Sequence, residues 1–340
     1  MSGLFALAGL PLGCSEDPGT PATTTSPDQV VYDPVRFEEG LEAVETWIID
    51  GRPDKAETIA RRLVTLNPDS LDALEAHGRC LTILGAMAAR EGRTDGEAQR
   101  ILALERYREL IDRSGNPPDP MHLHAAGLAA QAAGELDEAL DYHVRADTVE
   151  PSNAQHAIFA GNIHAGRDET EAARTWFTRA TIIDPREPWG WAGLAEAHRQ
   201  SGASEAALES IRSARARAPE NTGFRISEAR ILRESGRARE AAQLLFAIDP
   251  SRRATPAITA ELCAACTLIG EHRRAAEAWS ALHARSPDNH MAATSAAVAW
   301  IRSGEPEEAA TWLEAAAAAG ADPEELESIR RKLSRPDQPR

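Results

Sequence analysis

The chain has 340 residues, of which 5 % are aromatic and 26 % charged, and the abundance of alanine favours close-packed helices over a sheet of β-branched residues. The formal net charge of −16 and the pI near 5.1 exclude nucleic acid as a general partner, because a phosphate backbone would be repelled. Four cysteines are too few for a disulfide-framed scaffold, so we predict an all-α protein that is stabilised by apolar burial.

An apolar run from Leu4 to Leu12 leads into Gly13 and Cys14 and is followed by an acidic segment rich in Pro and Thr. The run is too short to span a bilayer. It resembles the end of a bacterial lipoprotein signal, in which an apolar region precedes a small residue and the cysteine that becomes lipidated. The resemblance implies that residues 1–13 are a signal segment and that Cys14 carries a lipid. The protein would then be anchored in the bacterial cell envelope, on the periplasmic side.

Two features depart from the lipoprotein pattern. No Lys or Arg precedes the apolar run, and Pro11 stands three residues before Cys14, where the pattern usually has the leucine that is here Leu10. The alternative is a cytoplasmic protein without an anchor. Residues 14–36 show no periodic apolar face, so we predict a flexible linker there.

A period of 34 residues runs through the rest of the chain. Alanine recurs at this step at Ala139, Ala173, Ala207, Ala241, Ala275 and Ala309. Glycine recurs at Gly134, Gly202, Gly236, Gly270 and Gly304, with Asp168 in the one gap, and proline at Pro151, Pro185, Pro219 and Pro287, with Arg253 in the gap. Small residues let two helices approach closely, glycine turns the chain and proline ends a helix. The spacing therefore predicts repeated helix pairs.

This register resembles the tetratricopeptide repeat, whose pattern runs W-x2-L-G-x2-Y, then A-x3-F, then P. The best match is residues 188–221, with Trp191, Leu194, Ala207 and Pro219 in place. The resemblance implies a right-handed α-solenoid of about eight helix-turn-helix repeats over residues 37–323. The expected repeats are 37–70, 71–119, 120–153, 154–187, 188–221, 222–255, 256–289 and 290–323. Residues 324–340 are predicted to hold a capping helix and a tail, because a solenoid must cover its last apolar face.

The second repeat, residues 71–119, is longer than the others. From Ala56 to Ala139 there are 83 residues, which is two periods and 15 further residues. The sequence stays helical in pattern except around Gly92 to Gly96, so we predict lengthened helices joined by a longer turn. Such an insertion is either a docking element or a neutral variation in length.

The chain contains no serine hydrolase, zincin, P-loop or dinucleotide-binding motif, so we predict no catalytic residue and no cofactor. Its ten histidines do not predict a metal site. His122 and His124 are two residues apart on a helix and point to different sides. His143, His164 and His198 fall where the repeat places buried aromatic residues.

The stretch ELCAACT contains Cys263 and Cys266 in a C-x-x-C spacing, which redox enzymes and zinc sites also use. In the repeat register both cysteines fall in the middle of a helix, at positions for packed residues, whereas a redox pair lies at a helix N-terminus. We therefore interpret the pair as small apolar side chains. An enzyme or metal protein that uses Cys263 and Cys266 is the remote alternative.

In the repeat family the first helix of each pair lines a concave groove, and its positions 2, 5, 9, 12 and 13 face the ligand. Carried over to this sequence, these positions include His124, Gln131, Gln155, Ile158, Asn162, Trp189, Arg199, Arg230 and Arg233. Only Asn162 matches the residues with which chaperone-tail-binding members hold their ligand, so such a ligand is not expected.

Arg199 and Arg233 are one period apart, with Arg230 beside them, and arginine pairs bidentately with carboxylates. We therefore predict a non-catalytic scaffold that binds an acidic protein or peptide partner. The alternative is that Glu196 pairs with Arg199, and Arg230 with Glu234, on an ordinary solvated face.

Overall fold

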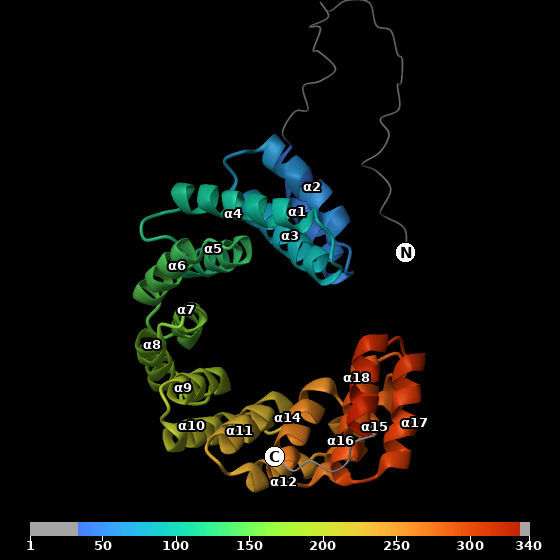
Figure 1. The fold of residues 1–340 in the computed structure, drawn as a ribbon. Coiled ribbons are helices and arrows are strands. Elements are labelled where there is room, and N and C mark those ends of the chain that lie inside the picture. Colours follow the sequence, from blue (N-terminus) through green and yellow to red (C-terminus); the bar gives the residue numbers. More distant parts are fainter. Residues whose placement is uncertain (1–32, 334–340) are drawn as a thin grey trace, which may run out of the picture. The chain divides into compact units, whose positions relative to one another are not determined.

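The computed structural model describes residues 33–333, and these residues form eighteen helices and no strand (Figure 1). The predicted all-α fold of stacked helix pairs is confirmed. The described residues divide into two compact units, one up to Cys80 and the other from Leu81 onward, which are described separately. Within residues 33–333, no helix has the length and apolar character that a bilayer span requires.

The first unit contains α1 (Pro34–Ile49), α2 (Pro53–Leu66) and the beginning of α3 (Leu71–Arg90). The segment predicted to be a linker, residues 14–36, therefore ends earlier than expected. The side chain of Asp33 caps α1 by accepting a hydrogen bond from the backbone N–H of Val35 at 3.1 Å, and Pro34 occupies the first helical position. The signal segment and Cys14 lie outside the described residues.

The second unit begins within α3 and continues with helices that pack in sequential pairs. These are α4 (Gly96–Arg113), α5 (Pro120–Ala133), α6 (Leu136–Val149), α7 (Ala154–Gly166), α8 (Thr170–Ile183), α9 (Pro188–Gln200), α10 (Ser204–Arg217), α11 (Thr222–Glu234), α12 (Ala238–Phe246), α13 (Pro250–Arg253), α14 (Pro256–Leu268), α15 (His272–Arg285), α16 (His290–Ser303), α17 (Pro306–Ala318) and α18 (Pro323–Leu333). The helices of the second repeat are long, with 20 residues in α3 and 18 in α4, which matches the predicted insertion.

We call the first helix of each pair helix A and the second helix B. The A helices of the last six pairs are α5, α7, α9, α11, α14 and α16, and the B helices are α6, α8, α10, α12, α15 and α17. In Figure 1, α5, α7 and α9 follow one side of the stack and α6, α8 and α10 follow the other. Helix A also contacts the next helix A, as α7 does with α9 and α11 with α14. The A helices therefore present a shared surface.

The turn between helix A and helix B requires a left-handed backbone conformation. Gly202, after α9, has φ 77°, which costs glycine little because it has no Cβ. Asp168 takes the same place after α7 with φ 59°, and it is the residue that replaces glycine in the 34-residue series. Aspartate tolerates this conformation better than most residues.

The pairs are held together by aromatic side chains that pack against glycine. Phe177 on α8 is 1 % exposed and belongs to a core cluster with Leu194. A Cβ built on Gly161 of α7 would lie 2.8 Å from the Phe177 ring, and a Cβ on Gly193 of α9 would overlap the same ring. Glycine at both positions therefore lets one phenyl ring join three helices.

Two regions depart from the regular pairs. Helix α12 has nine residues and ends at Phe246, and the four-residue α13 follows it, where the sequence pattern had predicted one ordinary helix B. At the C-terminus, α18 packs against α16 and α17 and buries Leu326 and Ile329, as expected of a capping helix.

Candidate functional site

Ion pairs connect the predicted groove residues across three successive A helices. Arg199 on α9 donates to Glu196 of its own helix at 2.6 Å and to Glu234 on α11 at 3.0 Å. Arg233 on α11 donates to both carboxylate oxygens of Glu261 on α14. We call these five residues, together with Arg230, the ionic ladder.

Hydrogen bonds favour the charged forms of Glu196, Arg199 and Arg233 in the ladder. The hydrogen bond from Arg199 holds the pKa of the Glu196 carboxyl below its usual value, and Glu196 in turn raises the pKa of Arg199. Glu261, which is 8 % exposed, raises the pKa of Arg233 by accepting its hydrogen bonds. Charge-assisted bonds of this kind are stronger than neutral ones, so these arginine side chains are held in place.

Arg230 is the least restrained arginine of the ladder. Its Nε lies 3.8 Å from a carboxylate oxygen of Glu261, and its side chain is 46 % exposed. The pairing of Arg199 with Glu196 follows the alternative that the sequence left open, whereas Arg230 pairs with Glu261 and not with Glu234. Glu261 was missed because its position in the repeat is not one that faces the ligand in the family.

Trp189 lies on the same A-helix surface and is 55 % exposed. Its ring meets the buried ring of Phe224 on α11 edge to face, with the centroids 5.2 Å apart. Residues seven and eleven positions further along α9, Glu196 and Gln200, lie on the same face of that helix. The large apolar side chain of Trp189 is therefore exposed to solvent on one side and held by its contact with Phe224 on the other.

The remaining predicted groove residues differ in their surroundings. Gln131 and Asn162 are exposed, and Gln155 donates a hydrogen bond to Glu187 at 3.2 Å. Ile158 is 4 % exposed and packs in the core with Phe177, so the expectation that it lies on the groove surface is wrong. Its side chain packs against the neighbouring pair of helices and is therefore not available to a ligand.

His124 is also drawn away from the open surface, into a cluster with other aromatic rings. Its ring centroid lies 5.6 Å from that of His143, 5.7 Å from that of His156 and 5.0 Å from that of Phe159. We call these four residues the histidine cluster. His143 is fully buried and fills the place that Phe177 has in the next repeat, packing against Gly127 as Phe177 packs against Gly161. The prediction that His143 is a core residue is confirmed.

Burial disfavours the charged forms of His143 and His124. It lowers the pKa of His143 to about 3, with further contributions from His124 and His156, and it lowers the pKa of His124. Neither ring nitrogen of His143 has a hydrogen-bond partner within the described part of the chain. Over residues 33–333, no group of three or more His, Cys, Asp or Glu side chains is arranged to hold a metal ion.

Cys263 and Cys266 lie inside α14 and are 4 % and 0 % exposed. Burial raises the pKa of both thiols, that of Cys266 to about 11, so both stay protonated at neutral pH. The Cys263 thiol donates to the carbonyl oxygen of Ala275 on α15 at 3.3 Å. The interpretation of the pair as packed side chains is confirmed.

Two family models match the sequence, and both are described as tetratricopeptide repeat. One covers residues 168–319 and the other residues 123–188, so together they span residues 123–319, more than half of the chain. A search of curated proteins found no match.

Solved structures with the same arrangement of helices were found as well. A tetratricopeptide repeat protein from Parabacteroides merdae ATCC 43184 is 14 % identical with a TM-score of 0.50, and the match covers 88 % of this chain and 98 % of that chain. The pilF protein of Pseudomonas aeruginosa is 14 % identical with a TM-score of 0.51, over 65 % of this chain and 94 % of that chain. At this level of identity, the similarity concerns the fold alone.

Proposed function

Since the chain belongs to the tetratricopeptide repeat family, we propose that it is a non-catalytic scaffold that holds a protein or peptide partner against its A helices. The observation that carries the proposal is the exposed ring of Trp189, which packs on Phe224 and lies on the same face of α9 as Glu196 of the ionic ladder. Tryptophan and arginine are the residues that most often dominate binding energy at protein interfaces. A rigid aromatic ring also loses little conformational entropy when a partner binds.

The ionic ladder defines the chemistry that the partner needs. Its three arginines face three glutamates, so the ladder is neutral within a chain of net charge −16 and repels an acidic partner less than the rest of the surface does. A carboxylate of the partner must compete with Glu261 for Arg230, which is the most exposed arginine. We propose an acidic segment that places a carboxylate at Arg230 and an apolar side chain on Trp189.

Capture of the partner from extracts of the native host tests this surface. We expect Trp189→Ala to lower capture of the partner about tenfold or more, because truncating an interface anchor commonly costs 2 kcal/mol or more. Ile182→Ala is the matched control, since Ile182 is a large apolar residue on helix B of the fourth repeat and is 74 % exposed. Its capture of the partner should equal that of the wild-type chain.

The charge is tested in the same assay by Arg230→Glu, which places a negative charge opposite the proposed carboxylate. Arg273→Glu is its control, because Arg273 lies on helix B and is 67 % exposed. Loss of partner capture with Arg230→Glu, but not with the control Arg273→Glu, supports the proposal. Retained capture with Arg230→Glu and Trp189→Ala combined, or equal loss with the two controls, would show that the partner binds elsewhere.

We further propose that a lipid on Cys14 anchors this scaffold at the periplasmic side of a bacterial membrane, on the basis of the lipoprotein-like pattern before Cys14. The alternative is a cytoplasmic adaptor. Mass spectrometry of the N-terminus of the protein from its native host should find an acylated Cys14 as the first residue. An intact N-terminus that begins at Met1 would contradict the anchor but leave the scaffold proposal untouched.

A further inference from the structure

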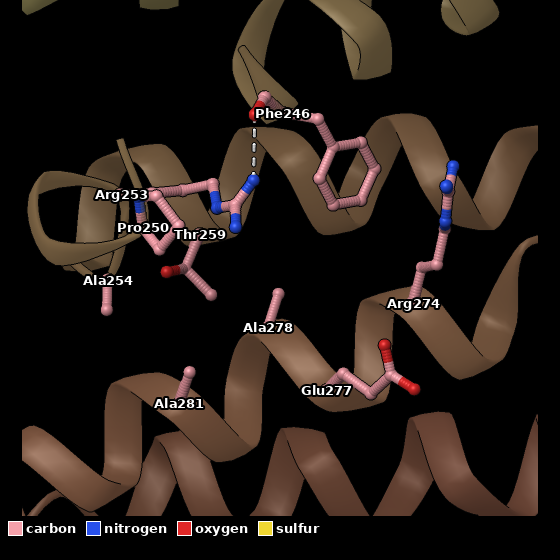
Figure 2. A pocket seen from close by; sticks show the side chains of 9 residues that line it. All are labelled: Phe246, Pro250, Arg253, Ala254, Thr259, Arg274, Glu277, Ala278 and Ala281. Carbon is pink, nitrogen blue, oxygen red and sulfur yellow. Dashed lines mark hydrogen bonds between the residues drawn. The ribbon is translucent and has the colours of Figure 1, made fainter. Parts of the chain in front are cut away.

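The shortened helix α12 leaves a pocket in the second unit. Helix α12 ends at Phe246 after nine residues, whereas the B helices α8, α10 and α15 each have 14 residues. At 1.5 Å per residue, the missing residues correspond to about 7 Å of helix. Pro250 starts the separate α13, and proline cannot continue a helix that precedes it. A cavity of about 150 Å³ lies between this segment, α14 and α15 (Figure 2).

The walls of the pocket are partly aromatic and partly cationic. The guanidinium carbon of Arg253 lies 5.2 Å from the ring centroid of Phe246, and that of Arg274 lies 4.8 Å from it. Figure 2 shows these two arginines on opposite sides of the ring, with Ala278 on the wall facing it. Thr259, a buried residue of α14, adds a hydroxyl group. Pro250, Ala254 and Ala281 complete the lining, together with Glu277.

Arg253 is the arginine of the pocket that has no ion pair with any described residue, although the nearby carboxylate of Asp249 interacts with its charge. Arg274 pairs with Glu271 at 2.9 Å, and Glu277 pairs with Arg273 at 3.2 Å. Within the described part of the chain, Arg253 forms no ion pair, and its hydrogen bond goes from Nη1 to the backbone carbonyl of Phe246 at 2.9 Å. A guanidinium group carries five N–H donors, so Arg253 retains donors for a ligand.

We propose that this pocket binds a monocarboxylate carried on a small apolar or aromatic group. The carboxylate accepts hydrogen bonds from Arg253, since arginine matches a carboxylate in charge and in geometry. The apolar group lies between the Phe246 ring and Ala278, in the space flanked by the two arginines.

The size and charge of the pocket set the limits of the ligand. A cavity of 150 Å³ is large enough for a benzene ring. Glu277 lines the same pocket and repels a second negative charge on the ligand, so a dicarboxylate or a phosphate should bind less well than a monocarboxylate.

The required chemistry can come from a free organic acid or from the C-terminal residue of a peptide. The pocket is separate from the A-helix surface proposed above, because neither Trp189 nor any residue of the ionic ladder lines it. A result at one surface therefore leaves the other open to its own test.

Benzoate is a probe of suitable size, and benzamide is its uncharged analogue. In a titration of the full chain followed by NMR of methyl-labelled alanine, benzoate should shift the resonances of Ala254, Ala278 and Ala281 in a saturable manner. Benzamide at the same concentrations should shift them much less, because it lacks the charge that Arg253 recognises.

Variants connect the binding to Arg253. Arg253→Gln should weaken benzoate binding about tenfold or more, because a charge-assisted bidentate contact is lost. Arg252→Gln, at the neighbouring residue that pairs with Glu220 outside the pocket, should bind like the wild type. Arg253 also holds the end of α12, so Ala278→Phe provides an independent variant, which should abolish binding by filling the cavity while Arg253 remains.

A peptide pair distinguishes the two sources. The peptide acetyl-Ala-Ala-Phe is tested with a free C-terminal carboxylate and as its amide. If the free acid binds more tightly than benzoate and the amide does not bind, the ligand is the C-terminus of a partner. Benzoate binding alone indicates a free acid. The proposal is overturned if neither probe binds up to its solubility limit, if benzamide equals benzoate, or if Arg253→Gln or Ala278→Phe binds like the wild type.

Discussion

Replacing Gly193 by alanine should lower the free energy of unfolding by about 2 kcal/mol, although alanine normally favours a helix over glycine. The added methyl group would overlap the ring of Phe177, which is fully packed and already in contact with Gly161. The ring cannot retreat without moving α7 or α8, because interiors of proteins are close-packed. Urea unfolding of the two proteins measures the difference.

Gly166→Ala is the matched control, because Gly166 also lies in a helix and a Cβ there would meet nothing within 4 Å. Its stability should stay equal or rise by up to about 1 kcal/mol. Adding Phe177→Leu to Gly193→Ala should cost less than the sum of the two single variants, because the smaller side chain relieves the overlap. A Gly193→Ala variant as stable as Gly166→Ala would contradict the close contact.

Acidification should destabilise the protein through His143. Burial lowers the pKa of His143 from 6.5 to about 3 in the folded chain. Between these two pH values the unfolded chain binds a proton at His143 that the folded chain does not bind. The contribution of the neutral His143 to the free energy of unfolding is therefore complete above about pH 6.5 and decreases as the pH falls. The loss should reach about 2 kcal/mol at pH 5.

The two histidines that face His143 also lower its pKa. His124 on α5 and His156 on α7 both add positive charge when protonated, and the pKa of His124 is itself lowered by burial. Glu150 accepts a hydrogen bond from His156 Nε2 at 3.1 Å and partly offsets this charge. The stability of the folded chain should therefore decline steadily, and not recover, between pH 6.5 and pH 4.

His143→Phe should remove this part of the pH dependence, since Phe177 fits the equivalent place in the next repeat. The gain in stability over the wild type should be larger at pH 5 than at pH 7.5, as measured by urea unfolding at each pH. Phe177→Leu, at the equivalent place of the next repeat, removes no titratable group and should lower the stability by the same amount at both pH values. Parallel curves for the wild type and His143→Phe would show that His143 is protonated in the folded chain.

The stacked helix pairs could be predicted because the information is local in the sequence and is repeated. Ala207 and its equivalents mark where two helices touch, and Gly202 marks the turn between them. Asp168 shows the strength of the period, because it adopts the left-handed backbone at the place where glycine is missing. Such features depend on residues within one or two turns of each other, so pattern alone identifies them.

The candidate sites could be predicted only in part, because their contacts join residues of different repeats. Sequence spacing predicted that Arg199 and Arg233 lie on neighbouring helices. It did not predict that the buried Glu261 pairs with Arg233. It also placed His124 on the open surface, where the structure shows it packed against His143. Which side chain fills a gap between helices depends on how closely the backbones approach, and this distance is set by packing.

The sequence by itself therefore determined the class of fold, the period and the residues at which most A helices begin, because short-range preferences and small residues act within each repeat. Only the tertiary structure decided which charges pair between helices, which side chains surround each buried ring and where a cavity remains. Arg253 illustrates the difference. In the sequence it only stands at a position where the 34-residue series otherwise has proline, whereas in the structure it lines a pocket beside Phe246. The physical reason is that solvation and pairing of a side chain depend on all its neighbours in space.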